Sequence, residues 1–276
     1  MAPDLDLDLD FKPDPDPIRV PKLFSPLAFL FLVERFYAGL IHNASSAEAG
    51  LGGRLLYVGD LGSGHDPKPN QDGRVLMVAA NIAGAASLVA TADPVTQKQF
   101  IHEGVADFLV TSLDEALRIL KNEIRRGEPV AVCIAAAHAS IEQEMVERGV
   151  LPDLVRDLDL AGTADRVVPF GGSPVLVAPL DPAEHESIIS WGVDEAPAQW
   201  LPRLDAIAMD CLAADESLSA QIARRWLHLA PRYLGRLAGN VRVLRCSAPA
   251  ANGIVERMRA AIQSGKISVP VRIDSV

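Results

Sequence analysis

Cysteine is scarce in this sequence of 276 residues and shows none of the spacings that bind metal ions. Cys133, Cys211 and Cys246 are odd in number, lie far apart and form neither a CxxC pair nor a Cys/His ligand pattern. Disulfide frameworks and zinc sites need such patterns, so we expect neither and predict no metal site. Each cysteine is instead expected to be a small buried apolar residue.

Basic residues are also few. The chain has 26 Lys and Arg against 36 Asp and Glu, which gives a formal net charge of −10, and its basic residues do not cluster. Nucleic acids and acidic membrane surfaces attract proteins through clustered Lys and Arg. We therefore exclude both as expected partners.

Long apolar runs are missing as well. The run 27–33 is far shorter than the ~20 residues that cross a bilayer. The chain opens with aspartates in place of the basic and apolar segments of a secretory signal. These features predict a cytoplasmic protein.

Apolar side chains, by contrast, are abundant and make up 49% of the chain. Residues 1–24 alternate Asp with Leu and then Pro with Asp, which predicts an extended acidic tail or, alternatively, an edge strand docked on a partner subunit. Beyond them, strands alternate with helices of ten or more residues, which is typical of an α/β fold with a doubly wound, mostly parallel, Rossmann-like sheet. We expect one such domain over 25–276, with an irregular insertion or cap at 163–204. The expected strands are 55–59, 87–93, 107–110, 129–135, 154–155, 205–209, 241–244 and 269–273, and the expected helices are 25–48, 75–84, 94–103, 113–126, 140–148, 217–237 and 252–263.

Several segments, in the same order along the chain, resemble the urocanase (urocanate hydratase) family. They are Gly52-Gly53-Arg54, Ala79-Ala80-Asn81-Ile82-Ala83-Gly84, the stretch 113–154 with its Arg148-Gly149-Val150-Leu151-Pro152-Asp153 turn, Arg225-Trp226-Leu227-His228-Leu229-Ala230 and Ser264-Gly265-Lys266-Ile267-Ser268-Val269-Pro270-Val271. The resemblance spans roughly residues 50–160 and 205–273. It implies a Rossmann-type fold in which NAD acts as an electrophile, and it implies a homodimer; the apolar helix containing Phe29-Leu30-Phe31 would serve that dimer or the core.

The resemblance and the turns at strand ends together select candidate cofactor-binding residues. Glycines after the first strand can let a phosphate approach the backbone, or can simply form a strand-to-helix turn. The family's ribose-binding Glu falls at Thr91, and Asp93 either replaces it or caps the next helix. After the expected strand 129–135, the small residues Ala136 and Ala137 stand where the family has Gly-Asn. The candidates are Gly59, Gly62, Gly64, Thr91, Asp93, Ala136 and Ala137.

Two further residues, His138 and Asp157, are candidates for a catalytic role. His138 follows a strand at the side where doubly wound sheets bind ligands, and Asp157 is the one residue kept from the family's Thr-Asp-Gln-Thr-Ser-Ala-His segment. The family's segment with the substrate-binding arginine and active-site cysteine has no counterpart in this sequence.

These observations predict a urocanase-like protein that binds a nucleotide, NAD by resemblance, or another small anionic ligand, without urocanate hydratase activity. Two alternatives stay open: an enzyme of different chemistry that uses His138, Asp93 or Asp157, and a non-catalytic assembly partner.

Overall fold

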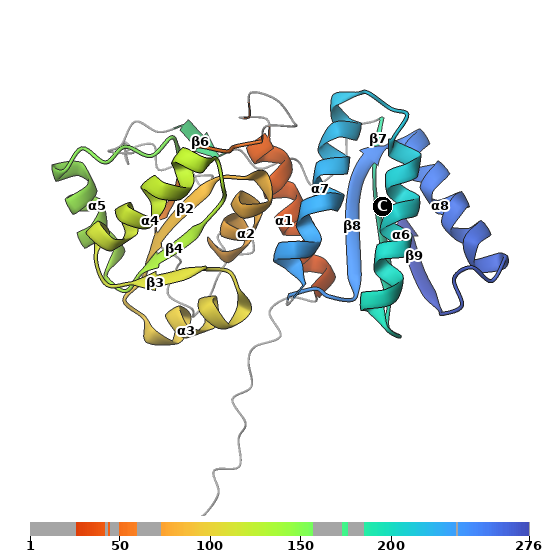
Figure 1. Cartoon of the computed structure of the whole chain (residues 1–276), viewed down its shortest axis with the longest axis horizontal. Helices are drawn as coiled ribbons and strands as arrows, with labels where there is room; N and C mark the ends of the chain where they lie inside the picture. Colours follow the sequence, from red (N-terminus) through yellow and green to blue (C-terminus); the bar gives the residue numbers. More distant parts are fainter. Residues whose placement is uncertain are drawn as a thin grey trace, which may run out of the picture.

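The computed structural model describes residues 26–41, 44, 50–59, 73–156, 173–175, 185–235 and 237–275. The expected tail at 1–24 lies outside these residues, and so does most of the predicted insertion before 185. In the described part, two β-sheets stand at the two sides of a set of helices (Figure 1).

The larger sheet has six strands, and every neighbouring pair in it is parallel. In spatial order it runs β3-β4-β2-β1-β5-β6. The strands are β1 (Leu55–Gly59), β2 (Ala86–Ala90), β3 (Phe108–Val110), β4 (Ala131–Ile134), β5 (Leu154–Arg156) and β6 (Ser173–Val175), and the connecting helices are α2 (Gly73–Ala83), α3 (Pro94–Glu103), α4 (Leu113–Arg126) and α5 (His138–Glu147). This arrangement confirms the expected Rossmann-like α/β fold.

Both faces of the sheet are covered around its central strands, because alternate residues of β1, β4 and β5 enter different cores. Leu56 of β1 packs into the core shared with α2, whereas Leu55 and Tyr57 pack into the core shared with α4 and α5. The first five strands therefore read as short, nearly continuous apolar runs.

The second sheet is antiparallel and has three strands in the order β8-β7-β9. They are β7 (Glu186–Val193), β8 (Val241–Ser247) and β9 (Val271–Ser275). The sequence predicted β8 and β9 but placed them in one mostly parallel sheet, and it missed β7 inside the supposed cap. β7 is the central strand of this sheet, and it is buried from Ile188 to Val193.

The strand predicted at 205–209 is wrong, because these residues lie inside helix α6 (Pro197–Leu212). A short apolar run cannot distinguish a strand from a buried helix segment by itself. Here Leu201, Leu204 and Ala208 recur at helical spacing and are buried together. Asp205 then accepts hydrogen bonds from Trp191 Nε1 of β7 at 3.0 Å and from Arg242 Nε of β8 at 3.1 Å, which fixes α6 on the second sheet.

Helices α1 (Pro26–Ile41), α2 and α7 (Leu218–Leu234) lie between the two sheets (Figure 1). Helix α8 (Ala248–Gln263) packs with α6 against the antiparallel sheet. One continuous apolar core runs through α1, α2, α7 and both sheets. Leu30 of α1 is only 1% exposed, so the apolar Phe29-Leu30-Phe31 segment serves the core.

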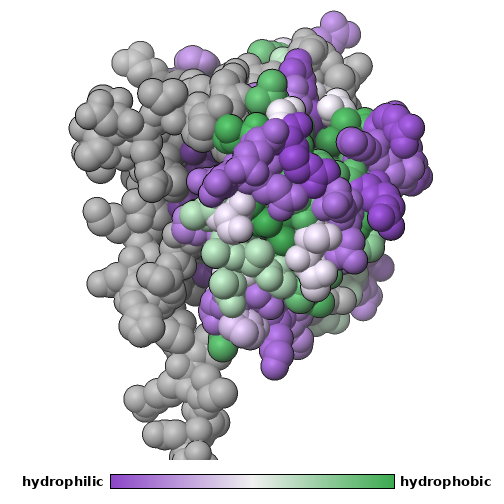
Figure 2. All heavy atoms as spheres, turned by 90° about the vertical axis from the view of Figure 1, so that its left-hand side faces the viewer, coloured by the Kyte–Doolittle hydropathy of each residue, from purple (hydrophilic) through white to green (hydrophobic). Residues whose placement is uncertain are grey.

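The opposite end of the molecule, at the left of Figure 1, carries the edge strand β3 and helices α3, α4 and α5. Figure 2 views this end and shows apolar side chains among hydrophilic ones. Phe108 and Leu109 of β3 are 46% and 42% exposed. The expected homodimer remains a prediction. Among the described helices, none is long and apolar enough to cross a membrane.

Candidate functional site

Parallel strands bring the described candidate residues to one edge of the larger sheet. The carboxyl ends of β1, β2 and β4 are neighbours there, because β2 pairs with both other strands. The backbone hydrogen bonding between β2 and β4 continues one residue past the end of β2, since the Thr91 amide donates to the Ile134 carbonyl at 3.1 Å. In doubly wound sheets the crevice outside these carboxyl ends binds ligands. The structure thus groups Gly59, Thr91, Asp93, Ala136, Ala137 and His138, whereas Gly62, Gly64 and Asp157 lie outside the described residues.

Gly59 ends β1 in a conformation that suits glycine. Its φ is +74°, and the pairing with β2 shifts register between Tyr57 and Gly59. A Cβ at this position would meet only ordinary contacts, the nearest being Glu142 Oε1 at 3.8 Å. Gly59 is buried, and among the described residues the backbone angle, and not crowding, requires glycine at this position.

Asp93 caps helix α3, which confirms the second of its two predicted interpretations. Its carboxylate accepts hydrogen bonds from the Val95 amide at 3.1 Å, from the Thr96 amide at 3.1 Å and from the Thr96 hydroxyl at 2.5 Å. The Thr96 hydroxyl, followed by these two amides, holds the pKa of Asp93 below its ordinary value. Most acceptor positions of this carboxylate are thus occupied, and its ribose-binding role stays a prediction.

Replacing Asp93 with alanine is expected to lower the melting temperature by a few degrees, because two helix amides lose their acceptor. Asp93→Asn keeps a capping oxygen and should retain most of the stability. The pKa of Asp93 is depressed in the folded state, so the contribution is present above the ordinary pKa and is lost as pH falls through the folded value. Thermal melts of both variants between pH 7 and pH 3 test this; equal melting temperatures for wild type and Asp93→Ala at pH 7 would contradict it.

Ala136 and Ala137 form the turn from β4 into α5. Ala137 occupies the N-cap position and has no side chain that could cap the helix. Its carbonyl accepts from the Ser140 and Ile141 amides, so the helix starts here and its first-turn amides point toward the sheet edge. Such a terminus favours anions through its amides and its dipole. His138 is the first residue of α5 and is half-buried.

Sequence reasoning missed a polar pair behind Gly59. The Tyr57 hydroxyl donates to Glu142 Oε1 of α5 at 3.3 Å, although the two residues are 85 positions apart. Tyr57 is buried, and Glu142 is half-buried. The signal was a single tyrosine in an otherwise aliphatic strand, since a buried hydroxyl needs a partner. Glu142 places a carboxylate beside the turn, which makes this part of the edge less favourable for phosphate.

None of the three cysteines forms a disulfide. Burial raises the pKa of Cys133 to about 11 and that of Cys246 to about 12, while Cys211 is half-buried. The first two therefore behave as the expected apolar residues. Within the described part of the chain, no three His, Cys, Asp or Glu side chains are grouped to hold a metal ion.

Residues 75–163 match the family described as the Urocanase Rossmann-like domain. This region starts after β1, inside α2, and contains the rest of α2, β2–β5 and α3–α5. The chain is also similar to S-methyl thiourocanate hydratase of Variovorax sp. (strain JCM 16519 / RA8), with 26% identity over 160 residues. The aligned part covers 58% of this chain and 28% of that relative's length.

Proposed function

We propose that this chain is a divergent member of the urocanase family and that the carboxyl edge of its parallel sheet binds a nucleotide of the NAD class. The observation that carries the proposal is the presence of two backbone features at one edge of the sheet, at the ends of β1 and β4, which lie on either side of β2. Gly59 ends β1 with a φ of +74°, and α5 begins after β4 at the same edge without a side-chain cap. Both features suit a pyrophosphate, which backbone amides can bind, although the Glu142 carboxylate beside Gly59 opposes an anion at that position.

The ribose end of the nucleotide would lie over β2. Thr91 Oγ1 accepts a hydrogen bond from the Asp93 amide at 3.3 Å, so its own hydroxyl proton can still be donated to a ribose oxygen. Thr91 is half-buried at this edge. It would thus take the position of the family's acidic residue with a weaker, uncharged contact.

We further propose that this chain does not hydrate urocanate. When bound, NAD would supply an electrophilic nicotinamide ring at this edge. Ala136 and Ala137 stand where the family has Gly-Asn, so the family's asparagine amide is missing from this turn. Loss of an orienting donor reduces catalysis more than binding, since catalysis demands tighter positioning.

Calorimetric titration with NAD tests the binding proposal through two matched glycine variants. Gly59 and Gly149 both have positive φ, +74° and +64°, and neither is crowded. Gly59→Ala and Gly149→Ala should each lower the free energy of unfolding by about 1–2 kcal/mol through the same backbone strain. Gly149 follows the far end of α5, so only Gly59→Ala should weaken NAD binding, by at least about fivefold.

If titration of the wild-type protein with NAD releases no heat of binding, the proposed site is refuted. If both variants lose affinity equally, the loss reflects reduced stability and not a contact at Gly59. Incubation of the NAD-saturated protein with urocanate and with S-methyl thiourocanate, followed by absorbance, tests catalysis. Steady consumption of either substrate would overturn the second proposal.

A further inference from the structure

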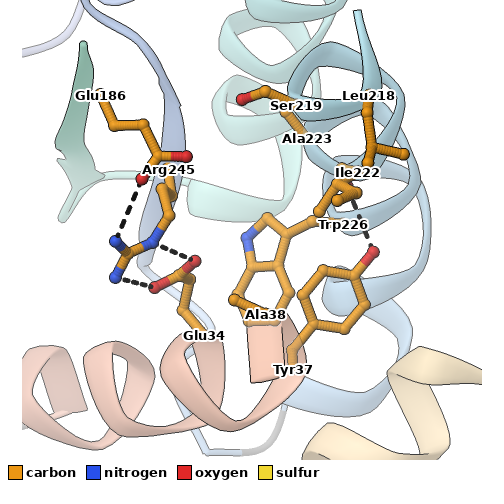
Figure 3. A pocket seen from close by; sticks show the side chains of 10 residues that line it. All are labelled: Glu34, Tyr37, Ala38, Glu186, Leu218, Ser219, Ile222, Ala223, Trp226 and Arg245. Carbon is orange, nitrogen blue, oxygen red and sulfur yellow. Dashed lines mark hydrogen bonds and ion pairs between the residues drawn. The ribbon is translucent and has the colours of Figure 1, made fainter. Parts of the chain in front are cut away.

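Cavities occur in both helix layers around the antiparallel sheet, and they differ in how their charged side chains are paired. The cavity between α1, α7 and the sheet has a volume of about 210 Å³ (Figure 3). In its wall, Arg245 of β8 donates from Nε to Glu34 Oε1 at 3.0 Å and from Nη2 to Glu34 Oε2 at 3.3 Å, and its Nη1 lies 3.6 Å from Glu186 Oε2 (Figure 3). The Glu34 side chain is buried, whereas that of Glu186 is partly exposed. Opposite charges contact each other in this wall, so it favours no particular charge in a ligand.

The other cavity lies between α6 and α8 and has a volume of about 440 Å³. This size is within the range of small-molecule sites. Its walls come from α6, from α8 and from the turn that follows α8. The lining residues are Ile207, Asp210, Arg257, Ala260, Ala261, Ser264 and Lys266.

Part of this cavity is apolar, because α8 presents small residues to α6. Ala260 and Ala261 of α8 and the half-buried Ile207 of α6 contribute this part. Two methyl groups fill less space than the longer side chains that usually join packed helices, so a hollow remains between α6 and α8. An apolar ligand body can cover this surface and remove it from water.

The turn after α8 carries Lys266 on a fixed backbone. The Ile267 amide and the Ser264 hydroxyl both donate to the Ala261 carbonyl, each at 3.2 Å. Gly265 completes the turn with a φ of +73°. Ile267 is buried in the apolar core. Lys266 therefore belongs to the rim of the cavity and not to a loose loop.

The charged residues of this cavity are unpaired. Asp210, Arg257 and Lys266 are exposed, and none of them forms a hydrogen bond or ion pair with another residue in the described part of the chain. Burial raises the pKa of the nearby Cys211 thiol, Arg257 lowers it and Asp210 raises it. Both charged groups are therefore close to the same sulfur atom, one from each helix, although they do not contact each other. The cavity thus presents one carboxylate and two cations around an apolar surface.

We propose that this cavity binds an apolar α-amino acid as a zwitterion, with its carboxylate near Arg257 and Lys266, its ammonium group near Asp210 and its side chain on the apolar part. A ligand with a single charge would leave one kind of charged group unmatched and would meet a like charge in the same cavity. Exposed ion pairs contribute little singly, so recognition depends on both charges and the apolar body together. The proposal is independent of the proposed nucleotide site, because the two share no residue.

Calorimetric titration with L-phenylalanine, hydrocinnamate and phenethylamine tests the need for both charges on one ring size. L-Phenylalanine should bind about fivefold more tightly than either molecule that lacks one charge, which corresponds to one exposed ion pair. Asp210→Asn should remove the advantage over hydrocinnamate without weakening hydrocinnamate itself. The double variant Arg257→Gln/Lys266→Gln should remove the advantage over phenethylamine. Arg259→Gln, which changes an exposed arginine of α8 outside the cavity, should leave all three affinities unchanged.

Ala260→Leu provides a second test, because its larger side chain occupies part of the cavity from an exposed position of α8. It should abolish L-phenylalanine binding while leaving the circular dichroism spectrum unchanged. If the wild-type protein binds neither L-phenylalanine nor L-leucine, the proposal is overturned. The same holds if the two singly charged molecules bind as tightly as L-phenylalanine, or if neither Ala260→Leu nor Asp210→Asn alters its affinity.

Discussion

Replacing Arg245 with alanine is expected to lower the free energy of unfolding by about 3–5 kcal/mol, because a buried carboxylate loses the guanidinium that binds it. Glu34 is 4% exposed and receives two hydrogen bonds from Arg245, and Arg35, the next residue of α1, adds only a weaker electrostatic attraction. The partly exposed Glu186 can turn to water, but Glu34 cannot. Urea denaturation of wild type and variant measures the difference.

The double variant Glu34→Leu/Arg245→Met distinguishes the destabilisation caused by an unpaired buried charge from the net stabilisation that the ion pair provides. Apolar side chains of similar size at both positions should recover most of the lost stability, since a buried ion pair contributes little net stabilisation over such a replacement. A double variant as unstable as Arg245→Ala would show that the pair itself stabilises the fold. A single variant within about 1 kcal/mol of wild type would contradict the expected charge burial.

The deficit of Arg245→Ala should depend on pH. Burial raises the pKa of Glu34 above its ordinary value of 4.5, while Arg245 opposes the rise. Without Arg245 the folded-state pKa rises further, so the folded variant binds a proton that the unfolded chain releases. Its stability therefore falls as pH increases from 4.5 through the raised pKa, and the deficit shrinks again in acid. Urea titrations at pH 5 and pH 8 measure this; an equal deficit at both would show that another group dominates.

Replacing Trp226 with alanine is expected to cost about 3–5 kcal/mol, the usual range for removing a buried aromatic side chain. Trp226 is 3% exposed, packs against the tilted ring of Tyr37 of α1 and donates to the Val243 carbonyl of β8 at 2.6 Å. It therefore joins α7 to both neighbours at the centre of the molecule. Chemical denaturation followed by circular dichroism gives the loss.

Trp226→Phe is the matched control, because it keeps an aromatic ring and removes the indole N–H. Its loss should be smaller, about 1–3 kcal/mol, reflecting one missing hydrogen bond and a reduced volume. If the phenylalanine variant were as unstable as the alanine variant, the hydrogen bond and not the packing would carry the effect.

The candidate site was predictable where its parts are local. Gly59, Thr91 and the Ala136-Ala137 turn each follow a short apolar run that pairs into the parallel sheet, so their shared edge follows from the strand pattern. The partners of these residues were not predictable. Tyr57 contacts Glu142 across 85 positions, and the sequence around either residue does not indicate that contact.

The buried ion pair between Glu34 and Arg245 shows the same limit more strongly. Glu34 and Arg35 interrupt the apolar pattern of α1, which signals a buried polar contact, but the sequence does not name the partner 211 positions away. The strand predicted at 205–209 failed for a related reason, since contacts with β7 and β8 decide which side of that segment is buried.

By itself, the sequence determined the parallel half of the protein, because alternating strand burial, helix caps and glycine turns depend on residues close together in the chain. It also carried the family likeness, which is a property of ordered local segments. Only the tertiary structure decided that β7, β8 and β9 form a separate antiparallel sheet, and that an acidic residue of α1 meets an arginine of β8. Both depend on contacts between segments far apart in the chain, whose free energy exists only once the intervening helices have packed.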